Sequence, residues 1–198
     1  MKIERCKWCL GDPLYIEYHD KQWGVPVCDE KLLFEMIVLE GAQAGLSWLT
    51  VLKKRETYRK VFADYDIEKI ARFDRDDVRR LCDEPGIVRN RVKIDSVVRN
   101  ARAVLDLWEK GKTFSEFVWQ FVDFKPIENN WTLEDLIPVK TDESEAMSKA
   151  LKEQGFFFVG PTICYAFMQA VGMVNDHVIS CFRHGEIKRI AEEFVFQS

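Results

Sequence analysis

The sequence lacks any apolar run of the roughly 18 to 20 residues that a membrane-spanning helix needs. Its first residues, Met1 to Cys6, also lack the apolar stretch of a secretory signal. Segments that alternate apolar and polar residues are scarce, whereas helical spacing of apolar residues is common. We therefore expect a cytoplasmic protein with an all-α fold and no membrane partner.

The chain also lacks an excess of positive charge, because its formal net charge is -4. Taken alone, this disfavours nucleic acid as a partner, but local patches rather than the net charge decide association. Basic residues gather within 53–60 and again within 89–102. Such clusters are most often solvated helix faces, so charge neither establishes nor excludes a nucleic-acid partner.

No internal repeat, low-complexity tract or long linker divides the 198 residues, of which 47% are apolar. We expect one domain over residues 1–198. Asp12, Asp29 and Ser47 each precede a helical pattern and predict N-caps. The predicted helices cover about 13–23, 30–40, 48–62, 88–108, 114–122, 144–154 and 162–171, with short helices after Asp66 and Asp74 and a partly helical end after His177. We expect mostly loop over 123–141 and a buried turn at 156–159.

Six cysteines in a cytoplasmic protein should be reduced, and some could be metal ligands. His177 and Cys181 are four residues apart and would share one face of a helix. Cys6 and His19 could complete a tetrahedral zinc site that joins the two ends of the chain. Each pair alone is more often accidental. Cys9 competes through a Cys-x2-Cys pair, and His184 competes with His177.

Two segments, 85–93 and 155–167, are typical of a helix-hairpin-helix element. A glycine turn before a helix lets backbone N–H groups converge on a DNA phosphate without net positive charge. An ordinary helix-helix turn with a glycine cap is the competing interpretation. Glycosylases with such a hairpin commonly carry a catalytic Asp two residues before a His. Asn175 occupies that position here and the Asp is at 176, so the usual catalytic Asp is absent or displaced.

Glu40 lies between apolar helix residues and a glycine break, which makes it a candidate buried carboxylate. Aromatic residues crowd the same quarter of the chain, at Trp8, Tyr15, Tyr18, Trp23 and Trp48. Core packing and helix capping are the ordinary explanations for these residues. The alternative is an aromatic box that stacks a flipped base, and cation–π attraction would favour a cationic alkylated purine there.

Ordered motifs over roughly residues 5–181 resemble the bacterial 3-methyladenine DNA glycosylase I family of the constitutive Tag type. They are Asp12-Pro13-Leu14-Tyr15-Ile16, Tyr18-His19-Asp20, Trp23-Gly24-Val25-Pro26, Leu39-Glu40-Gly41 through Trp48, Leu52-Lys53-Lys54-Arg55-Glu56, Gly86-Ile87-Val88-Arg89, Phe158-Val159-Gly160, Thr162-Ile163-Cys164-Tyr165 and Val174-Asn175-Asp176-His177. The family often has Gln where this chain has Ala42, so this chain lacks a polar side chain at that position.

The resemblance implies a role for each group of candidate residues. Cys6, His19, His177 and Cys181 would bind a structural zinc ion, and Cys9 and His184 would not. Glu40 and Tyr18 would be the catalytic pair, with Trp48, Tyr15, Trp8 and Trp23 lining the base pocket. Gln43 to Leu46 would fill the gap that the flipped nucleotide leaves, and Gly160 and Thr162 would contact DNA at the second hairpin.

The function that the resemblance implies is DNA repair by base excision. The enzyme would hydrolyse the glycosidic bond of 3-methyladenine in double-stranded alkylated DNA and leave an abasic site, with free 3-methyladenine as the product ligand. We expect a monofunctional monomer in which Tyr18 hydrogen-bonds or orients Glu40. The alternatives are a helix-hairpin-helix glycosylase of other specificity or with lyase activity, a zinc-stabilised binder of alkylated DNA or purines, and a structural zinc protein.

Overall fold

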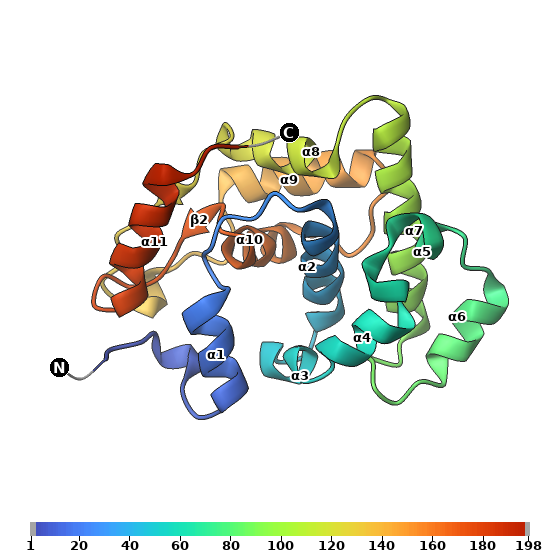
Figure 1. The fold of residues 1–198 in the computed structure, drawn as a ribbon, viewed down its shortest axis with the longest axis horizontal. Helices are drawn as coiled ribbons and strands as arrows, with labels where there is room; N and C mark the ends of the chain where they lie inside the picture. The colour runs from blue at the N-terminus through green and yellow to red at the C-terminus, as the bar shows by residue number, and fades with distance from the viewer. Residues whose placement is uncertain (1–2, 197–198) are drawn as a thin grey trace.

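The computed structural model describes residues 3–196 and is mostly helical, which confirms the all-α prediction (Figure 1). Two two-residue strands, β1 (Ile127–Glu128) and β2 (Val174–Asn175), form one short parallel pair. The α-helices are α1 (Pro13–Lys21), α2 (Glu30–Gln43), α3 (Trp48–Leu52), α4 (Arg55–Val61), α5 (Ile67–Ala71), α6 (Arg75–Cys82), α7 (Arg91–Glu109), α8 (Phe114–Trp119), α9 (Asp142–Glu153), α10 (Pro161–Ala170) and α11 (Phe182–Glu193). Short 3-10 helices lie at Lys7–Cys9, Ala63–Tyr65, Gln120–Val122 and Glu134–Leu136.

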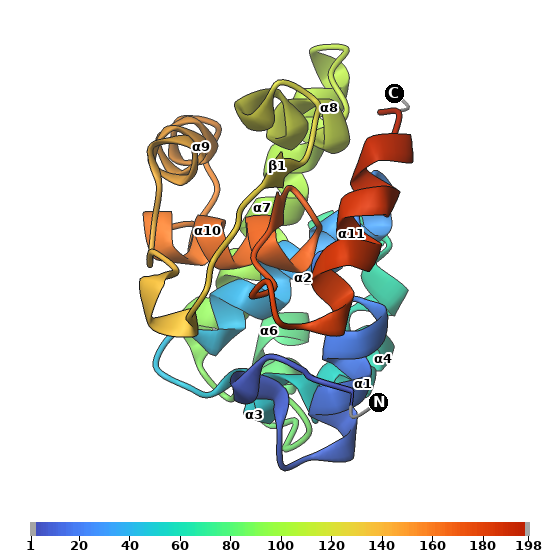
Figure 2. The same cartoon turned by 90° about the vertical axis from the view of Figure 1, so that its left-hand side faces the viewer.

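Helix α2 is the central helix of the core, and every residue from Leu33 to Ala42 is buried. Figures 1 and 2 show it in the middle of the molecule, with α10 beside it in both views. A Cβ atom at Gly41 would lie 3.1 Å from the Phe158 Cβ atom, so glycine lets α2 approach the turn before α10. This packing brings Glu40 near the start of α10.

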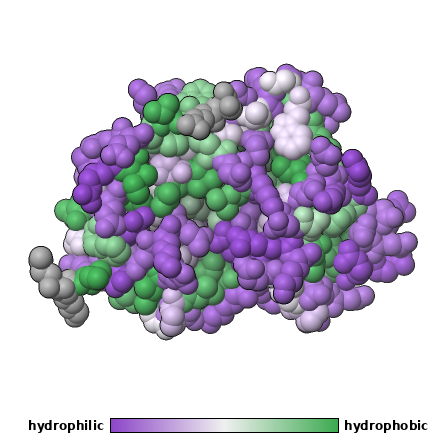
Figure 3. All heavy atoms as spheres, viewed as in Figure 1, coloured by the Kyte–Doolittle hydropathy of each residue, from purple (hydrophilic) through white to green (hydrophobic). Residues whose placement is uncertain are grey.

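Helices α4 to α7 form the end of the molecule on the right of Figure 1. Hydrophilic residues cover that end of the surface, over α6 (Figure 3). Arg55 and Arg59 from α4 both donate to the buried Glu35 of α2, at 2.8–3.0 Å. Burial acts to raise the pKa of the Glu35 carboxyl, but the hydrogen bonds from the two arginines hold it below its usual range. The basic cluster at 53–60 is therefore only partly a solvated face, because Arg55 joins two helices inside the protein.

Several helix boundaries differ from the predicted ones. The helix predicted over 48–62 is split into α3 and α4 at Lys53 and Lys54. The helix predicted from Val88 begins at Arg91, because the Asn90 side chain accepts hydrogen bonds from the N–H groups of residues 92 and 93. His177 and Cys181 do not share a helix face, because they lie in the turn before α11 and Cys181 is its N-cap.

Within residues 3–196, no helix is both long and apolar enough to cross a membrane.

Candidate active site and metal cluster

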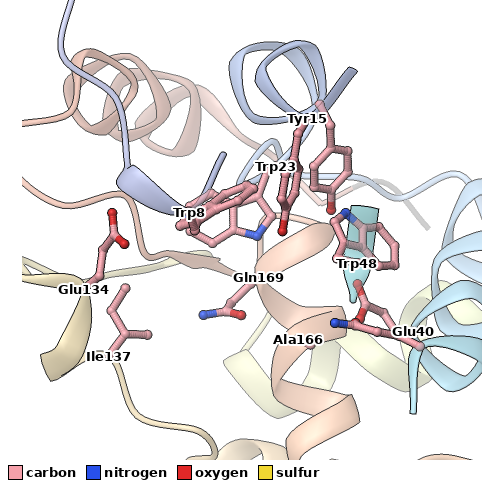
Figure 4. Close-up of a pocket in the computed structure, with 11 residues that line it drawn as sticks. Trp8, Tyr15, Trp23, Glu40, Trp48, Glu134, Ile137, Ala166 and Gln169 are labelled. Atoms are coloured by element: carbon pink, nitrogen blue, oxygen red, sulfur yellow. The ribbon is translucent and has the colours of Figure 1, made fainter. Parts of the chain in front are cut away.

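A cavity of about 320 Å³ lies between α1, α2, α3, α10 and the 3-10 helices at Lys7–Cys9 and Glu134–Leu136 (Figure 4). It is lined by Trp8, Tyr15, Tyr18, Trp23, Glu40, Gln43, Trp48, Glu134, Ile137, Ala166 and Gln169. All six residues expected to bind or process the base therefore face one cavity. Its volume is at the lower end of the roughly 300–1,000 Å³ of small-molecule sites.

The aromatic side chains of the cavity contact one another at tilted and edge-on angles. The Trp8 ring lies 4.9 Å from Tyr15 and 5.0 Å from Trp23, measured between ring centroids. The Tyr18 and Trp48 rings lie 5.4 Å apart. These contacts hold the rings in a fixed arrangement and leave apolar faces against the cavity.

Glu40 is the buried acid of this cavity, with 4% of its surface exposed. Among residues 3–196, no group donates a hydrogen bond to its carboxyl group, and burial raises its pKa to about 8. Burial also raises the pKa of Tyr18 well above 10. The expected hydrogen bond between Tyr18 and Glu40 does not form, so both polar groups keep their capacity to bond a ligand.

A second cavity of about 220 Å³ shares Glu40, Gln43 and Ala166 with the first. Gly45, Leu46 and Thr162 also line it, so most of the expected DNA-contacting residues meet here. Leu46 is 41% exposed at its edge. Gly160 is not among its lining residues and forms the N-cap of α10 instead.

Lys93 holds the segment that connects α2 to α3. Its Nζ atom donates to the backbone carbonyls of Ala42 and Ala44, at 2.8 and 2.6 Å. The Ala42 side chain is buried and does not line the cavity; Gln43 supplies the polar side chain there. Lys93 thus satisfies carbonyls at a helix end that would otherwise be unpaired, and it orders the start of the Gln43–Leu46 loop.

The two predicted hairpins differ in what their glycines do. At Gly86, a Cβ atom would lie 2.4 Å from the Thr57 Cγ2 atom, so glycine is needed there for close packing. Gly155 has a φ of +90° and ends α9 in the left-handed region. A Cβ atom at Gly160 would have no atom within 4 Å, and Gly160 precedes Pro161 at the first position of α10. Only the second hairpin borders the cavities.

Cys6, His19, His177 and Cys181 form a buried cluster whose ligand atoms all lie within 4.8 Å of one another. The Cys181 Sγ atom is 3.4 Å from His19 Nε2 and 3.6 Å from His177 Nδ1, and Cys6 Sγ is 3.7 Å from His177 Nδ1. Tetrahedral bonds of about 2.3 Å to sulfur and about 2.0 Å to nitrogen place neighbouring S and N ligands roughly 3.5 Å apart. The four side chains therefore fit a structural metal ion.

Groups around the cluster orient its imidazoles as they do in metal sites. Asp20 Oδ1 lies 2.8 Å from His19 Nδ1, and the Arg5 guanidinium donates to the same carboxylate. The Trp23 carbonyl lies 3.1 Å from His177 Nε2. These contacts leave His19 Nε2 and His177 Nδ1 to face the two thiols. The cluster links the N-terminal segment to the turn before α11.

The competing metal ligands lie outside this cluster. The Cys9 thiol donates to the Cys6 carbonyl at 3.1 Å. His184 Nε2 faces the Asn129 carbonyl at 2.9 Å. Neither side chain offers a ligand atom to the cluster.

Sequence reasoning missed Glu134, Ile137, Ala166 and Gln169 in the cavity and Lys93 beneath the loop. Ala166 and Gln169 are three residues apart on α10 and so share a face. A glutamine within that apolar helix was a usable signal. Glu134 and Ile137 come from a segment predicted as loop, where spacing carries no information about contacts.

Comparisons with known proteins agree with this geometry. Residues 8–184 match the family described as methyladenine glycosylase. The chain is 55% identical over 179 residues to DNA-3-methyladenine glycosylase 1 of Escherichia coli K12, covering 90% of this chain and 96% of that protein. It is 49% identical over 177 residues to DNA-3-methyladenine glycosylase of Haemophilus influenzae Rd, covering 89% and 96%.

Solved structures match over the same region. A crystal structure of 3-methyladenine DNA glycosylase I superposes with a TM-score of 0.89 at 54% identity, covering 90% of this chain and 98% of that one. A variant of 3-methyladenine DNA glycosylase I in complex with 3-methyladenine superposes with a TM-score of 0.87 at 36% identity, covering 90% and 96%. A structure of 3-methyladenine DNA glycosylase I from Staphylococcus aureus, which concerns 3-methyladenine recognition, superposes with a TM-score of 0.87 at 37% identity. The match covers 90% of this chain and 95% of that one.

Proposed function

The chain belongs to the methyladenine glycosylase family, and from that premise we propose that it excises 3-methyladenine from alkylated DNA by holding the flipped base against Glu40. It is a DNA-3-methyladenine glycosylase, a hydrolase that cleaves an N-glycosidic bond. The observation that carries the proposed site is a buried carboxyl group that has no hydrogen-bond donor among residues 3–196 and lies among aromatic rings in a cavity. Such a group lacks a structural explanation and fits a ligand.

The charge of the substrate explains the composition of this cavity. A methyl group on N3 makes the base of the nucleotide cationic and weakens its glycosidic bond. Aromatic faces at Trp8, Tyr15 and Trp48 attract such a cation, and the ionised Glu40 complements its charge. Because Glu40 has a pKa of about 8 in the free protein, binding of a cationic base favours its ionised form and releases a proton. Tyr18 contributes a second polar group to the same base.

The reaction needs little acid–base assistance from the protein. The N3-methylated base departs as a neutral leaving group, so no general acid has to protonate it. Water adds to the anomeric carbon of the sugar as the bond from that carbon to the base breaks; the bonding electron pair leaves with the base, and the proton lost by the water passes to solvent. The product in the DNA is an abasic site. Among the described residues no lysine lines either cavity, and Lys93 Nζ is held by two carbonyls. The absence of a poised amine supports a monofunctional enzyme that does not cleave the strand.

Double-stranded DNA would bind across the second cavity. The Gln43–Leu46 loop would fill the gap left by the flipped nucleotide, with the exposed Leu46 side chain as its apolar wedge. Gly160 and Thr162, at the start of α10, would offer backbone N–H groups to a phosphate. We propose a single domain that acts as a monomer on one lesion at a time, with free 3-methyladenine as its product ligand. It would work in the cytoplasm, where bacterial DNA is found.

We further propose that the ion at Cys6, His19, His177 and Cys181 is zinc. Two thiolates and two imidazoles are a ligand set that zinc prefers, and the S···N distances match a tetrahedral site. With four protein ligands the ion has no open position, so its part is structural.

The test is to incubate the purified protein with methylated duplex DNA and to chromatograph the released bases. We expect release of 3-methyladenine while 7-methylguanine stays in the DNA. Glu40→Gln should lose most of this release and bind free 3-methyladenine more weakly while keeping its fold. Release at the wild-type rate by that variant would refute the role of Glu40. A folded protein that binds 3-methyladenine without excising it would be a binding module instead.

A further inference from the structure

Asp176 is a buried carboxylate with 1% of its surface exposed, and four donors surround it. Asn129 Nδ2 and Trp131 Nε1 each donate to its Oδ1 atom at 2.7 Å. The Tyr165 hydroxyl and Gln169 Nε2 donate to its Oδ2 atom at 2.7 and 2.8 Å. Each oxygen already accepts two hydrogen bonds, so Asp176 has no free acceptor with which to activate a water molecule.

This network determines which way the Gln169 amide faces. A carboxylate oxygen only accepts hydrogen bonds, so the part of the amide that faces Asp176 must be the NH₂ group. The Oε1 atom is then turned away from Asp176. Gln169 lines the base cavity, and in Figure 4 its amide oxygen is on the side of Ala166 and Glu40. The cavity thus contains a hydrogen-bond acceptor, Gln169 Oε1, whose orientation is fixed by the hydrogen bond to Asp176.

We propose that Gln169 selects the base, with its Oε1 atom accepting a hydrogen bond from the exocyclic 6-amino group of 3-methyladenine. Asp176 is then a positioning residue that acts through Gln169. This inference rests on the proposed function and adds a specificity residue to it. It places one acceptor on α10 and another, Glu40, on α2, so that they can bond the amino group from two elements.

The same arrangement works against a 6-oxo purine. A carbonyl oxygen at position 6 would meet Gln169 Oε1, and two acceptors cannot bond each other. The amide cannot turn over to offer its NH₂ group, because Oε1 would then face the Asp176 carboxylate. The 6-oxo purine is therefore rejected because the Gln169 amide is held in one orientation. Removing either this amide or Asp176 should weaken that rejection.

The experiment compares two free bases, 3-methyladenine and 3-methylhypoxanthine, which differ by an amino or an oxo group at position 6. Affinities for the full-length wild type, Gln169→Leu and a surface control, Gln154→Leu, are measured by calorimetry. We expect Gln169→Leu to lower the ratio of the two affinities about 10-fold, mainly through weaker binding of 3-methyladenine. Gln154→Leu should match the wild type. An unchanged ratio for Gln169→Leu, including an equal loss for both bases, would overturn the proposal.

Asp176→Asn gives a second, sharper readout. Its amide nitrogen would face Gln169 as a donor, which lets Gln169 turn over and present its NH₂ group to the cavity. We expect 3-methylhypoxanthine to bind this variant more tightly than it binds the wild type. If the variant folds and shows no such gain, Asp176 does not position Gln169; if it does not fold, Gln169→Leu alone decides. Wild-type protein that releases no 3-methyladenine from DNA would instead refute the proposed function.

Discussion

Replacing Glu40 with Gln should stabilise the protein, and by more at higher pH. The folded protein holds the pKa of this carboxyl at about 8, whereas its ordinary value is 4.5, because burial disfavours the charged form. That rise corresponds to roughly 5 kcal/mol at about 1.4 kcal/mol per tenfold change in proton affinity. Below pH 4.5 the carboxyl is mostly neutral in both the folded and the unfolded protein, and the protein has its full stability. As the pH rises toward 8, the carboxyl ionises in the unfolded protein but stays neutral in the folded one, so the free energy of unfolding falls. Glutamine carries no charge and escapes this loss.

The expected difference in unfolding free energy between Glu40→Gln and the wild type is about 1 kcal/mol at pH 5 and about 4 kcal/mol at pH 8. Urea unfolding of both proteins at several pH values measures it, and ionisation of the metal cluster cancels because both proteins share it. Glu17→Gln, on the exposed face of α1, is the matched control and should show no such trend. A difference for Glu40→Gln that stays constant from pH 5 to 8 would refute the reasoning.

Three further perturbations test other parts of the structure. Cys181→Ser should lose the bound ion, seen by elemental analysis, and lower the melting temperature by roughly 10 °C; an unchanged melting temperature would contradict a structural ion. Lys93→Met removes both hydrogen bonds to the carbonyls of Ala42 and Ala44, so excision from DNA should fall about 10-fold while free 3-methyladenine binds within about twofold of wild type. Equal losses in both assays would show that Lys93 acts beyond the loop. Gly172→Ala should destabilise the protein by about 3 kcal/mol or more in urea, because its φ is +70° and a Cβ atom would lie 2.2 Å from the Val25 carbonyl carbon; a smaller loss would show that the backbone there can yield.

Much of the site could be predicted because its residues carry local signals. Glu40 is an acid within an apolar helix and next to a glycine, which is unusual in any context. Caps such as Asp12 and Asp29 mark helix starts through the hydrogen bonds that their side chains accept. The aromatic residues near the N-terminus were recognisable as a group, although spacing alone could not tell core from cavity.

The rest depends on contacts between distant segments, which spacing does not encode. Lys93 was grouped with other basic residues as a solvated face, yet its Nζ atom reaches carbonyls about 50 residues earlier in the chain. The role of Asp176 required knowing its four donors, two of which come from a segment predicted as loop. The His177 and Cys181 pair was assigned to a helix face, whereas a turn brings its atoms together.

The metal cluster also sets an order of events during synthesis. Its first two side chains are at positions 6 and 19 and its last two at 177 and 181, so it cannot assemble until Cys181 has left the ribosome. Cys6 directly precedes the 3-10 helix at Lys7–Cys9 and His19 lies on α1, and these two helices also carry Trp8, Tyr15 and Tyr18 of the base cavity. A growing or truncated chain can therefore build α2 and its neighbours without a finished cavity. The cluster can therefore begin to hold this part of the cavity wall only after Cys181 has been made.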